Sequence, residues 1–306
     1  MKINFTKMHG CGNDYVYIDG AKELVPQDQK SDLAVKVSDR HFGIGSDGLI
    51  FINPVADDDI DFEMEMYNAD GSRSEMCGNG IRCVAKYVYD KKLTDKTKLT
   101  IVSAGKKKYI DLTIGSDGLV ETVKVDMGAP ILDSASVPVS VSDELLSKDN
   151  KKYETLSKEY GRLAVDVPIE VAGKTWHMTC VSMGNPHCVV FLPDGEDLAS
   201  FDIEAVGPLF ENHKAFPNRT NTEFVKIDDK NNVHMRVWER GTGETLACGT
   251  GCCATTVACI LNGLTDTEVT VHVLGGDIKC SWDESPSSPV IMEGPATTVF
   301  EGEIEI

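Results

Sequence analysis

Two cysteine-containing segments, MCGNGIRC at residues 76–83 and ACGTGCCA at residues 247–254, determine how the rest of this chain is interpreted. Each follows an alternating, strand-like stretch, DFEMEMYN (61–68) or HMRVWER (234–240), and a polar turn rich in glycine. Apolar residues at helical spacing follow each cysteine, which predicts that a helix begins there. The same order of strand, turn, cysteine and helix therefore occurs twice.

A second pair of similar segments precedes the cysteines. HGCGNDYVYI at 9–18 resembles SMGNPHCVVF at 182–191, because each has Gly-Asn followed by β-branched and aromatic residues. Their asparagines lie 64 and 63 residues before the respective cysteines. A third pair, VDMGAP at 125–130 and IMEGPA at 291–296, closes each half. Three pairs in the same order at nearly constant spacing predict two homologous halves.

The two expected helices differ in how much of their surface is apolar. The first, at about 79–91, has one apolar face formed by Ile81, Val84, Ala85 and Val88. The second, at about 250–261, is small or apolar almost all round, which is typical of a helix buried on every side. Asn262-Gly263 supplies its end. We expect a sheet to wrap around each helix.

The halves divide near residue 133, where a stretch rich in Ser, Lys and Glu indicates a surface excursion rather than core. Several short strands and then a helix in each half predict an α+β fold. We therefore expect two pseudo-symmetric domains, residues 1–133 and residues 134–294.

Composition and charge restrict the classes of partner. The 306 residues carry a formal net charge of −19, which argues against a nucleic-acid partner or an anionic membrane surface, since both require a basic patch. No apolar run approaches the ~18 residues of a membrane span, and the N-terminal residues lack the apolar core of a secretory signal. We expect a cytoplasmic protein whose ten cysteines are mostly reduced and buried.

Cys77 and Cys248 are the cysteines expected to perform chemistry. Each precedes the first turn of a helix, where unpaired N–H groups and the helix dipole favour an anion. A contribution of ~1–2 kcal/mol would lower each thiol pKa to about neutrality. Because the first charge opposes the second, the expected state is one thiolate and one thiol. A base and an acid on opposite faces of one carbon suit stereochemical inversion without a cofactor or a metal.

Polar residues in the same segments suit an amino-acid ligand. Glu239-Arg240 offers an anion and a cation that match a zwitterion, although such pairs often face solvent instead. Asparagines offer both a donor and an acceptor, although Asn beside Gly is also a common turn residue. The candidates are Asn13, Asn68, Asn185 and Asn221.

At these residues the chain resembles the diaminopimelate epimerase family, whose members interconvert LL- and meso-diaminopimelate in lysine and peptidoglycan precursor biosynthesis without a cofactor. The resemblance extends over nearly the whole chain. Its most specific segments are KMHGCGNDYVYID, NADGSRSEMCGNGIRC, VSMGNPHCVVF, RTNTEF and VWERGTGETLACGTGCCA.

The resemblance implies a role for each candidate residue. Cys77 and Cys248 would be the acid and base, and His187 would support them, although a purely structural histidine is the alternative. Glu239 and Asn13 would bind the ammonium group of the reacting centre. Its carboxylate would lie on the N–H groups of Gly78, Asn79, Gly249 and Thr250. The distal amino-acid group of the substrate would be bound by Asn68, Asn185, Asn221 and Arg240.

The resemblance also implies that each domain is a mixed β-sheet wrapped barrel-like around its central helix, with the active site in the cleft between the domains. It further implies that residues 295–306 cross back to the first domain and that the protein is a homodimer. Three features depart from the family pattern. Gly48 stands where some members have a substrate-contacting Gln, and Phe300 stands where a tail Tyr is associated with dimerisation. The segment at 143–162 is longer than usual and has no assigned role.

Other functions share some of these residues. Proline racemase and hydroxyproline epimerase also use paired cysteines, but a cyclic imino acid has no distal group for the asparagine and arginine cluster to bind. A cysteine hydrolase activated by His187 would leave the second cysteine unexplained. A metal-binding protein could use Cys248, Cys252 and Cys253, but these lack the spacing of a zinc site. Bound zinc in the purified protein would favour that alternative.

Overall fold

The computed structural model describes residues 2–74, 77–142, 144–146, 151–193, 195–285 and 287–305, with the backbone alone at 151–155. The chain forms two compact units. Unit 1 contains Met1–Asp126 and Glu293–Ile306, and unit 2 contains Met127–Met292. The division lies seven residues before the expected one because Ile131 and Asp133 already form β-bridges to Ser182 and Leu163 of unit 2.

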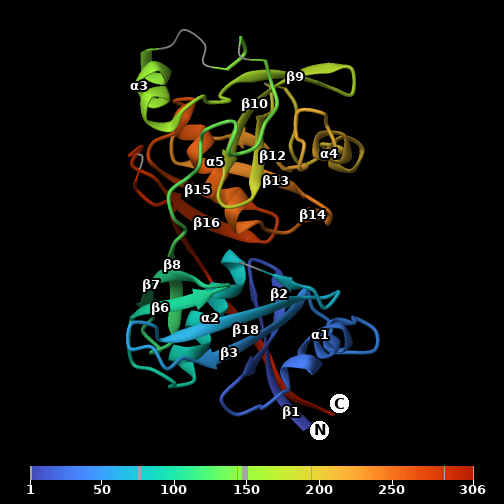
Figure 1. Ribbon diagram of the computed structural model, residues 1–306, viewed down its shortest axis with the longest axis vertical. Coiled ribbons are helices and arrows are strands. Elements are labelled where there is room, and N and C mark those ends of the chain that lie inside the picture. Colours follow the sequence, from blue (N-terminus) through green and yellow to red (C-terminus); the bar gives the residue numbers. More distant parts are fainter. Residues whose placement is uncertain are drawn as a thin grey trace. The chain divides into compact units, whose positions relative to one another are not determined.

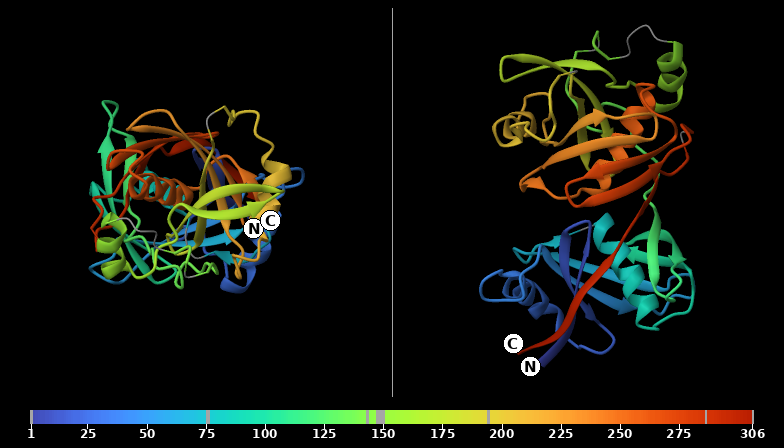
Figure 2. Two further views of the ribbon diagram at one scale, coloured as in Figure 1. Left: turned by 90° about the horizontal axis from the view of Figure 1, so that it is seen from above. Right: turned by 180° about the vertical axis from the view of Figure 1, so that it is seen from behind.

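The described residues of unit 1 form a mixed sheet and two α-helices (Figure 1). Its helices are α1 (Lys30–Ser38), which follows a short 3-10 helix (Gln27–Gln29), and α2 (Gly78–Asp90). Its strands are β1 (Lys2–Gly10), β2 (Asn13–Asp19), β3 (Gly48–Pro54), β4 (Phe62–Asn68), β5 (Arg73–Ser74), β6 (Lys98–Ser103), β7 (Lys106–Ile114), β8 (Val120–Asp126) and β18 (Thr297–Glu305). The C-terminal strand β18 pairs antiparallel with β1. Figure 1 and the two views of Figure 2 all show the two chain ends side by side.

Unit 2 has the same kinds of element. Its helices are α3 (Lys151–Tyr160), α4 (Ile203–Glu211) and α5 (Gly249–Leu261). Its strands are β9 (Val167–Val171), β10 (Lys174–Ser182), β11 (Pro186–Phe191), β12 (Asn221–Ile227), β13 (Asn232–Glu239), β14 (Gly243–Thr245), β15 (Glu268–Val273) and β16 (Gly276–Ser281). Strand β17 (Ile291–Gly294) contains the boundary at which the chain returns to unit 1.

The strand pairings confirm the duplication predicted from the sequence. In unit 1, β2 is parallel to β3, β3 antiparallel to β4, and β4 parallel to β6. In unit 2, β11 is parallel to β12, β12 antiparallel to β13, and β13 parallel to β15. The fold is therefore α+β, with a mixed sheet built by the same sequence of pairings in each unit.

Each central helix is buried against its own sheet. Every residue of α5 is buried except Thr250, as its apolar sequence predicted. Helix α2 is buried over more than the expected face, since Arg82 and Cys83 are enclosed as well. Both helices end in the same way: the N–H groups of the two residues after the cap bond back to the last turn. The C-cap residue is Lys91 in α2 and Asn262 in α5.

The stretch after residue 133 is not simply the surface excursion that its composition indicated. Val137, Val139 and Leu146 are buried in the core of unit 2, together with Trp176 and Phe210. They are apolar residues inside a polar stretch, and burying them contributes the usual ~1.5–3 kcal/mol each. Part of the 143–162 segment, residues 143 and 147–150, lies outside the described residues.

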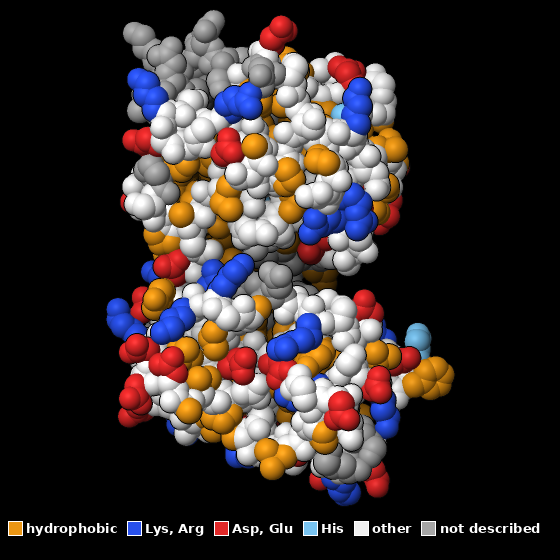
Figure 3. Space-filling model, in the orientation of Figure 1, with side chains coloured by type: hydrophobic (Ala, Val, Ile, Leu, Met, Phe, Trp, Pro, Cys, Tyr) orange, Lys and Arg blue, Asp and Glu red, His pale blue; other side chains and the backbone are white. Residues whose placement is uncertain are grey.

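The surface of each unit mixes charged and apolar side chains, as the face drawn in Figure 3 shows. In the part of the chain that the structure describes, no helix combines the length and the hydropathy needed to span a membrane.

Candidate active site

The two cysteines singled out from the sequence are the N-caps of the two central helices. Cys77 precedes α2, and its Sγ accepts a hydrogen bond from the Gly80 N–H at 3.2 Å. Cys248 precedes α5, and its Sγ accepts one from the Gly251 N–H at 3.4 Å. Both caps have extended backbone dihedrals. Each sulfur therefore replaces the oxygen of an ordinary N-cap and lies where the helix N-terminus stabilises a thiolate.

In unit 1, Asn13 and Asn79 lie beside Cys77. The Cys77 thiol and the Asn79 Nδ2 both point to Asn13 Oδ1, each at 3.3 Å. Asp47 fixes the orientation of the Asn13 amide by accepting its Nδ2–H at 2.8 Å. The oxygen of Asn13 is thereby held toward the thiol, which is the polarity that an ammonium group requires.

Arg82 is a fully buried residue of unit 1 whose importance the sequence did not indicate. Its guanidinium donates to the Gly78 carbonyl at 3.3 Å, to Asn79 Oδ1 at 3.0 Å and to the Pro295 carbonyl at 3.1 Å. It therefore fixes the first turn of α2 against the segment that leads into β18. Met76, inside the first cysteine motif, lies outside the described residues.

The Asn68 side chain bonds to a neighbouring turn residue rather than to Cys77, Asn13 or Asn79. Its Nδ2 donates to Ser72 Oγ at 3.0 Å, at the end of β4. Gly48 pairs with Asn68 across the sheet, and a Cβ atom on residue 48 would stand 2.2 Å from the Tyr67 carbonyl oxygen. With this backbone a side chain at 48 would collide with the Tyr67 carbonyl, so position 48 offers no side chain to a substrate.

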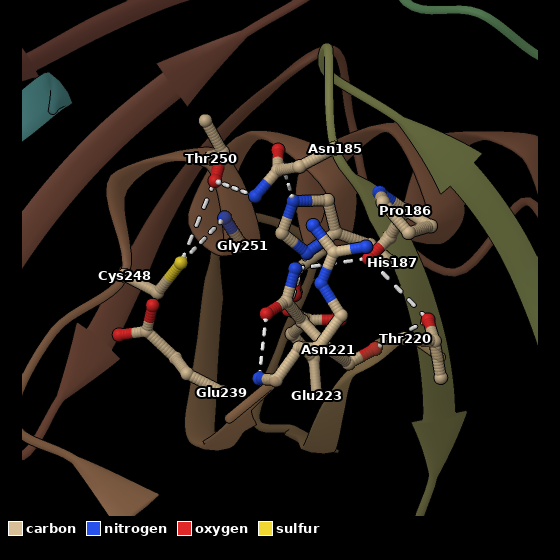
Figure 4. A network of polar contacts seen from close by, with 12 residues as sticks. Asn185, Pro186, His187, Thr220, Asn221, Glu223, Glu239, Cys248, Thr250 and Gly251 are labelled. Atoms are coloured by element: carbon tan, nitrogen blue, oxygen red, sulfur yellow. Dashed lines mark hydrogen bonds and ion pairs between the residues drawn. The ribbon is translucent and has the colours of Figure 1, made fainter. Parts of the chain in front are cut away.

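In unit 2, a continuous chain of contacts leads away from the Cys248 sulfur (Figure 4). Thr250 Oγ1 lies 3.5 Å from Cys248 Sγ, and Asn185 Nδ2 donates to the same hydroxyl oxygen at 3.3 Å. The Asn185 Oδ1 then lies 3.0 Å from Nε2 of His187. On the far side of the ring, His187 Nδ1 lies 2.6 Å from Oε1 of Glu223.

The electrostatic environment of Cys248 differs from the expectation. Burial raises the pKa of the Cys248 thiol well above its ordinary value, and the carboxylates of Glu239 and Glu223 raise it further. The hydrogen bonds from Thr250 and Gly251 oppose this shift but do not outweigh it. The prediction of a pKa near neutrality was therefore wrong for Cys248, because desolvation and two nearby carboxylates exceed the effect of the helix terminus.

Glu239 lies beside the Cys248 sulfur, as Figure 4 shows. Its carboxylate accepts a hydrogen bond from the Thr245 hydroxyl. Burial raises the pKa of Glu239 as well, although the Thr245 hydrogen bond and His187 oppose that shift. A cationic group placed next to this carboxylate would relieve the unfavourable burial of its charge.

Asn221 and Arg240 form a separate contact in unit 2. The Arg240 N–H donates to Asn221 Oδ1 at 2.9 Å, and Asn221 Nδ2 donates to the Pro186 carbonyl at 2.9 Å. The Arg240 guanidinium reaches the Asn218 carbonyl at 3.0 Å. Asn221 thus holds the backbone next to Asn185 and Arg240.

Glu223 is the second residue that sequence reasoning missed. It is fully buried on β12, within a strand whose residues from Asn221 to Val225 are all buried. A charged residue inside the otherwise uncharged run NTEFV was the available signal, since a buried carboxylate requires a partner. Its partner His187 comes from the neighbouring strand β11.

A metal site was the alternative that the sequence left open for Cys248, Cys252 and Cys253. Among them, no three His, Cys, Asp or Glu side chains are grouped closely enough to hold a metal ion. Cys252 and Cys253 are fully buried on α5, as expected for helix residues packed in a core.

The diaminopimelate epimerase family model matches residues 5–132 and 179–299. The diaminopimelate epimerase of Agathobacter rectalis is 53% identical over 304 residues, covering 99% of this chain and 100% of its own. That of Methanococcus maripaludis is 48% identical with the same coverage.

Solved structures share the fold at much lower identity. A PhzF-family phenazine biosynthesis protein of Bacillus anthracis has a TM-score of 0.69 at 18% identity and covers 100% of both chains. A hydroxyproline epimerase from Agrobacterium vitis has a TM-score of 0.63 at 12% identity, covering 99% of this chain and 91% of its own. At these identities the likeness extends to the fold alone, whereas the sequence match settles the family. This chain belongs to the diaminopimelate epimerase family.

Proposed function

We propose that the protein converts LL-2,6-diaminopimelate to meso-diaminopimelate, and the reverse, by moving a proton at one α-carbon. The observation that carries this proposal is the repeated cap: each half of the chain places a cysteine sulfur at the start of its central helix. Relatives of the same length at 53% and 48% identity bear the name of this activity. The reaction supplies a precursor of lysine and of peptidoglycan.

One thiol removes the proton and the other returns a proton to the opposite face of the carbon. The raised pKa of Cys248 favours its protonated form, so Cys248 is the acid in the resting enzyme and Cys77 is the base. After one turnover in the LL-to-meso direction the roles are reversed, and proton exchange with solvent restores the resting form. The proposal requires both sulfurs to reach one α-carbon from opposite sides when substrate is bound.

The substrate's reacting centre is a zwitterion, and the residues around the thiols offer partners for both charges. The N–H groups of the first helical turns suit the carboxylate, because the N-terminus of a helix favours an anion. Asn13 and Glu239 present oxygens toward the thiols, which suits the ammonium group. The carboxylate-binding groups belong to Gly78, Asn79, Gly249 and Thr250.

The distal amino-acid group is the feature that distinguishes diaminopimelate from proline. We assign it to Asn68, Asn185, Asn221 and Arg240. Arg240 is partly exposed and its guanidinium suits a carboxylate in bidentate contact. The enzyme is further proposed to be cytoplasmic and homodimeric, to need no cofactor and to bind neither nucleic acid nor membranes.

Exchange of the α-proton in heavy water tests this mechanism. The wild-type enzyme should incorporate deuterium at the α-carbon of diaminopimelate while interconverting the isomers. Cys77→Ala and Cys248→Ala should each abolish epimerisation. Cys259→Ala removes a buried thiol on the C-terminal half of α5 and should retain activity. Full activity in either of the first two variants would refute the two-thiol mechanism.

A further inference from the structure

His187 and Glu223 form a buried pair whose proton content follows from its contacts. Both side chains are 0% exposed, and His187 Nδ1 lies 2.6 Å from Glu223 Oε1. Among the described residues no donor reaches the second carboxylate oxygen, Glu223 Oε2. An ionised carboxylate in such a place requires a charged hydrogen-bond donor, because leaving it unpaired is costly.

The other ring nitrogen of His187 also faces an acceptor. Its Nε2 lies 3.0 Å from Asn185 Oδ1, while the Asn185 Nδ2 is used by Thr250. An amide oxygen and a carboxylate oxygen only accept hydrogen bonds. Neutral imidazole has one N–H and satisfies one of these two acceptors, whereas imidazolium satisfies both.

From this geometry we infer that Glu223 keeps His187 doubly protonated, so that His187 acts as a fixed hydrogen-bond donor and Glu223 as a positioning residue for Cys248. The inference rests on the proposed function for its catalytic meaning, but the protonation of the ring is independent of it. His187 in this state cannot accept a proton from Cys248, which excludes it as the base that activates this thiol.

The consequence for Cys248 is a set of hydrogen bonds that all point toward its sulfur. His187 Nε2–H donates to Asn185 Oδ1, which turns Asn185 Nδ2–H toward Thr250 Oγ1. Having accepted that bond, the Thr250 hydroxyl is free to donate to Cys248 Sγ. A donor at this position stabilises the thiolate that forms when Cys248 delivers its proton to the substrate carbon.

A neutral His187 whose single hydrogen lies on Nδ1, toward the Glu223 carboxylate, would not fix this direction. If its Nε2 became an acceptor, the Asn185 amide would turn over and present its oxygen to Thr250. The Thr250 hydroxyl would then donate to Asn185 instead of to the sulfur, and the thiolate would lose a hydrogen bond. With one hydrogen held on Nδ1 by Glu223, the second one, on His187 Nε2, therefore decides which way the chain of contacts is polarised.

The other ionisable groups around the pair are compatible with this state. Glu239 on β13 interacts with His187 and, as a carboxylate, favours the imidazolium form. Glu223 also interacts with two buried thiols, Cys188 on β11 and Cys248 at the start of α5, and burial raises the pKa of each thiol and so favours its uncharged form.

The equivalent positions of unit 1 lack such a pair. The matched segments place Tyr15 where unit 2 has His187. The residue packed behind the helix start is Ile50 in unit 1 and Glu223 in unit 2, each lying against the third residue of its helix. The pair is thus a feature of the Cys248 half alone, and Cys77 serves as an internal reference.

Nuclear magnetic resonance of protein labelled with 15N in its histidines tests the protonation directly, without substrate. In the wild type at about pH 8, both His187 ring nitrogens should carry hydrogen, although an ordinary histidine is neutral there. Glu223→Gln should leave one ring proton. Glu211→Gln removes another buried carboxylate of unit 2, which bonds Trp238 and Arg219, and should leave both protons on His187. One ring proton in the wild type would overturn the inference.

The pH profile of kcat tests the link to catalysis. In Glu223→Gln, the ratio of variant to wild-type kcat should fall about tenfold from about pH 6 to about pH 8.5, the effect of one hydrogen bond to a charged group. A merely structural loss would lower this ratio equally at every pH, as expected for Glu211→Gln. A pH-independent ratio in Glu223→Gln would refute the positioning role. Absence of epimerase activity in the wild type would refute the proposed function and leave the ring-proton result standing.

Discussion

Gly251 lies so close to Glu223 that a Cβ atom on residue 251 would stand 2.8 Å from Glu223 Oε1. In the other half of the chain, a Cβ on Gly80 would stand 2.9 Å from Ile50 Cδ1. The two helices therefore approach their sheets equally closely at their third residue. The close approach is made against a flexible apolar side chain in unit 1 and against a fixed carboxylate in unit 2.

This difference predicts different costs for the same substitution. In Gly80→Ala, the end of the Ile50 side chain can move aside, and the better helix propensity of Ala offsets the contact, so the stability change should be about zero. In Gly251→Ala, the added methyl group displaces a carboxylate held by His187, which should cost about 1–2 kcal/mol after the same offset. Denaturant unfolding of both variants measures the difference. Equal losses of unfolding free energy in the two variants would contradict the predicted difference between the Ile50 and Glu223 contacts.

The C-terminal ends of the same helices give a second matched comparison. Lys92 and Gly263 occupy the same position after α2 and α5, with φ angles of 60° and 69°. Lys92→Gly should stabilise the protein by about 0.5–1 kcal/mol, because glycine adopts this backbone region without strain. Loss of the Lys92 contact with the Tyr89 ring subtracts part of that gain.

Gly263→Ala should have the opposite effect. No atom lies within 4 Å of an added Cβ at this position, so the cost is conformational and about 1 kcal/mol. Thermal or denaturant unfolding checks both variants, and neither substitution touches the proposed catalytic residues. If Lys92→Gly and Gly263→Ala shifted stability in the same direction, the two positions after α2 and α5 would not be equivalent.

Glu65 makes the stability of unit 1 depend on pH. Burial raises its pKa, but hydrogen bonds outweigh this effect and lower the pKa from 4.5 to about 2. The donors are Lys30, Gln27, Tyr67 and Asn53. Because the folded-state pKa is depressed, the stabilisation is complete above about pH 4.5 and is lost as pH falls toward about 2.

The shift corresponds to about 3 kcal/mol at neutral pH. Glu65→Gln should reduce the dependence of unfolding free energy on pH in this window and destabilise the protein at pH 7 by a similar amount, since Lys30 stays buried. Chemical denaturation at about pH 7 and about pH 4 measures both quantities. Lys22→Gln, at an exposed lysine paired with Asp19, is the control and should change stability by under about 1 kcal/mol. An unchanged acid dependence in Glu65→Gln would exclude this carboxylate as its source.

Much of the fold could be predicted because the same sequence pattern occurs in both halves of the chain. The repeated order of strand, turn, cysteine and helix located both central helices to within one residue at their starts, Gly78 and Gly249. The domain boundary was less accurate, since Ile131 and Asp133 already form β-bridges within unit 2. The polar stretch after 133 also hides Val137 and Val139, which are core residues. Composition averages over a segment and so conceals single buried side chains.

The candidate site shows what pattern reasoning cannot supply. Cys77 and Cys248 were identified because helix starts have a general electrostatic effect. The direction of the Cys248 pKa shift was not predictable, because it depends first on burial and then on two carboxylates brought from other strands, Glu239 and Glu223. Sequence spacing does not reveal that β11 and β12 are neighbours, so the pair of His187 and Glu223 emerges only from the sheet.

The environment of Cys248 leads to a final prediction about thiol reactivity. Burial is the main cause of its raised pKa, followed by the charge of Glu239. Glu239→Gln should therefore lower the pKa of Cys248 and speed its alkylation by iodoacetamide at about pH 8, by up to about tenfold if the pKa falls by one unit. Mass spectrometry of the digested protein reports each cysteine separately, and the rate at Cys77, in the other unit, should not change.

The control is Glu244→Gln, which removes a carboxylate that forms a bidentate pair with Arg236 on the neighbouring strand. Glu244 is one residue from Thr245, the residue that binds Glu239, so this variant tests whether disturbing β14 alone alters the thiol. It should leave Cys248 alkylation unchanged. If Glu239→Gln slowed the alkylation of Cys248, Glu239 would be acting as a proton acceptor that assists the thiolate, and the order of electrostatic effects at this sulfur would have to be reversed.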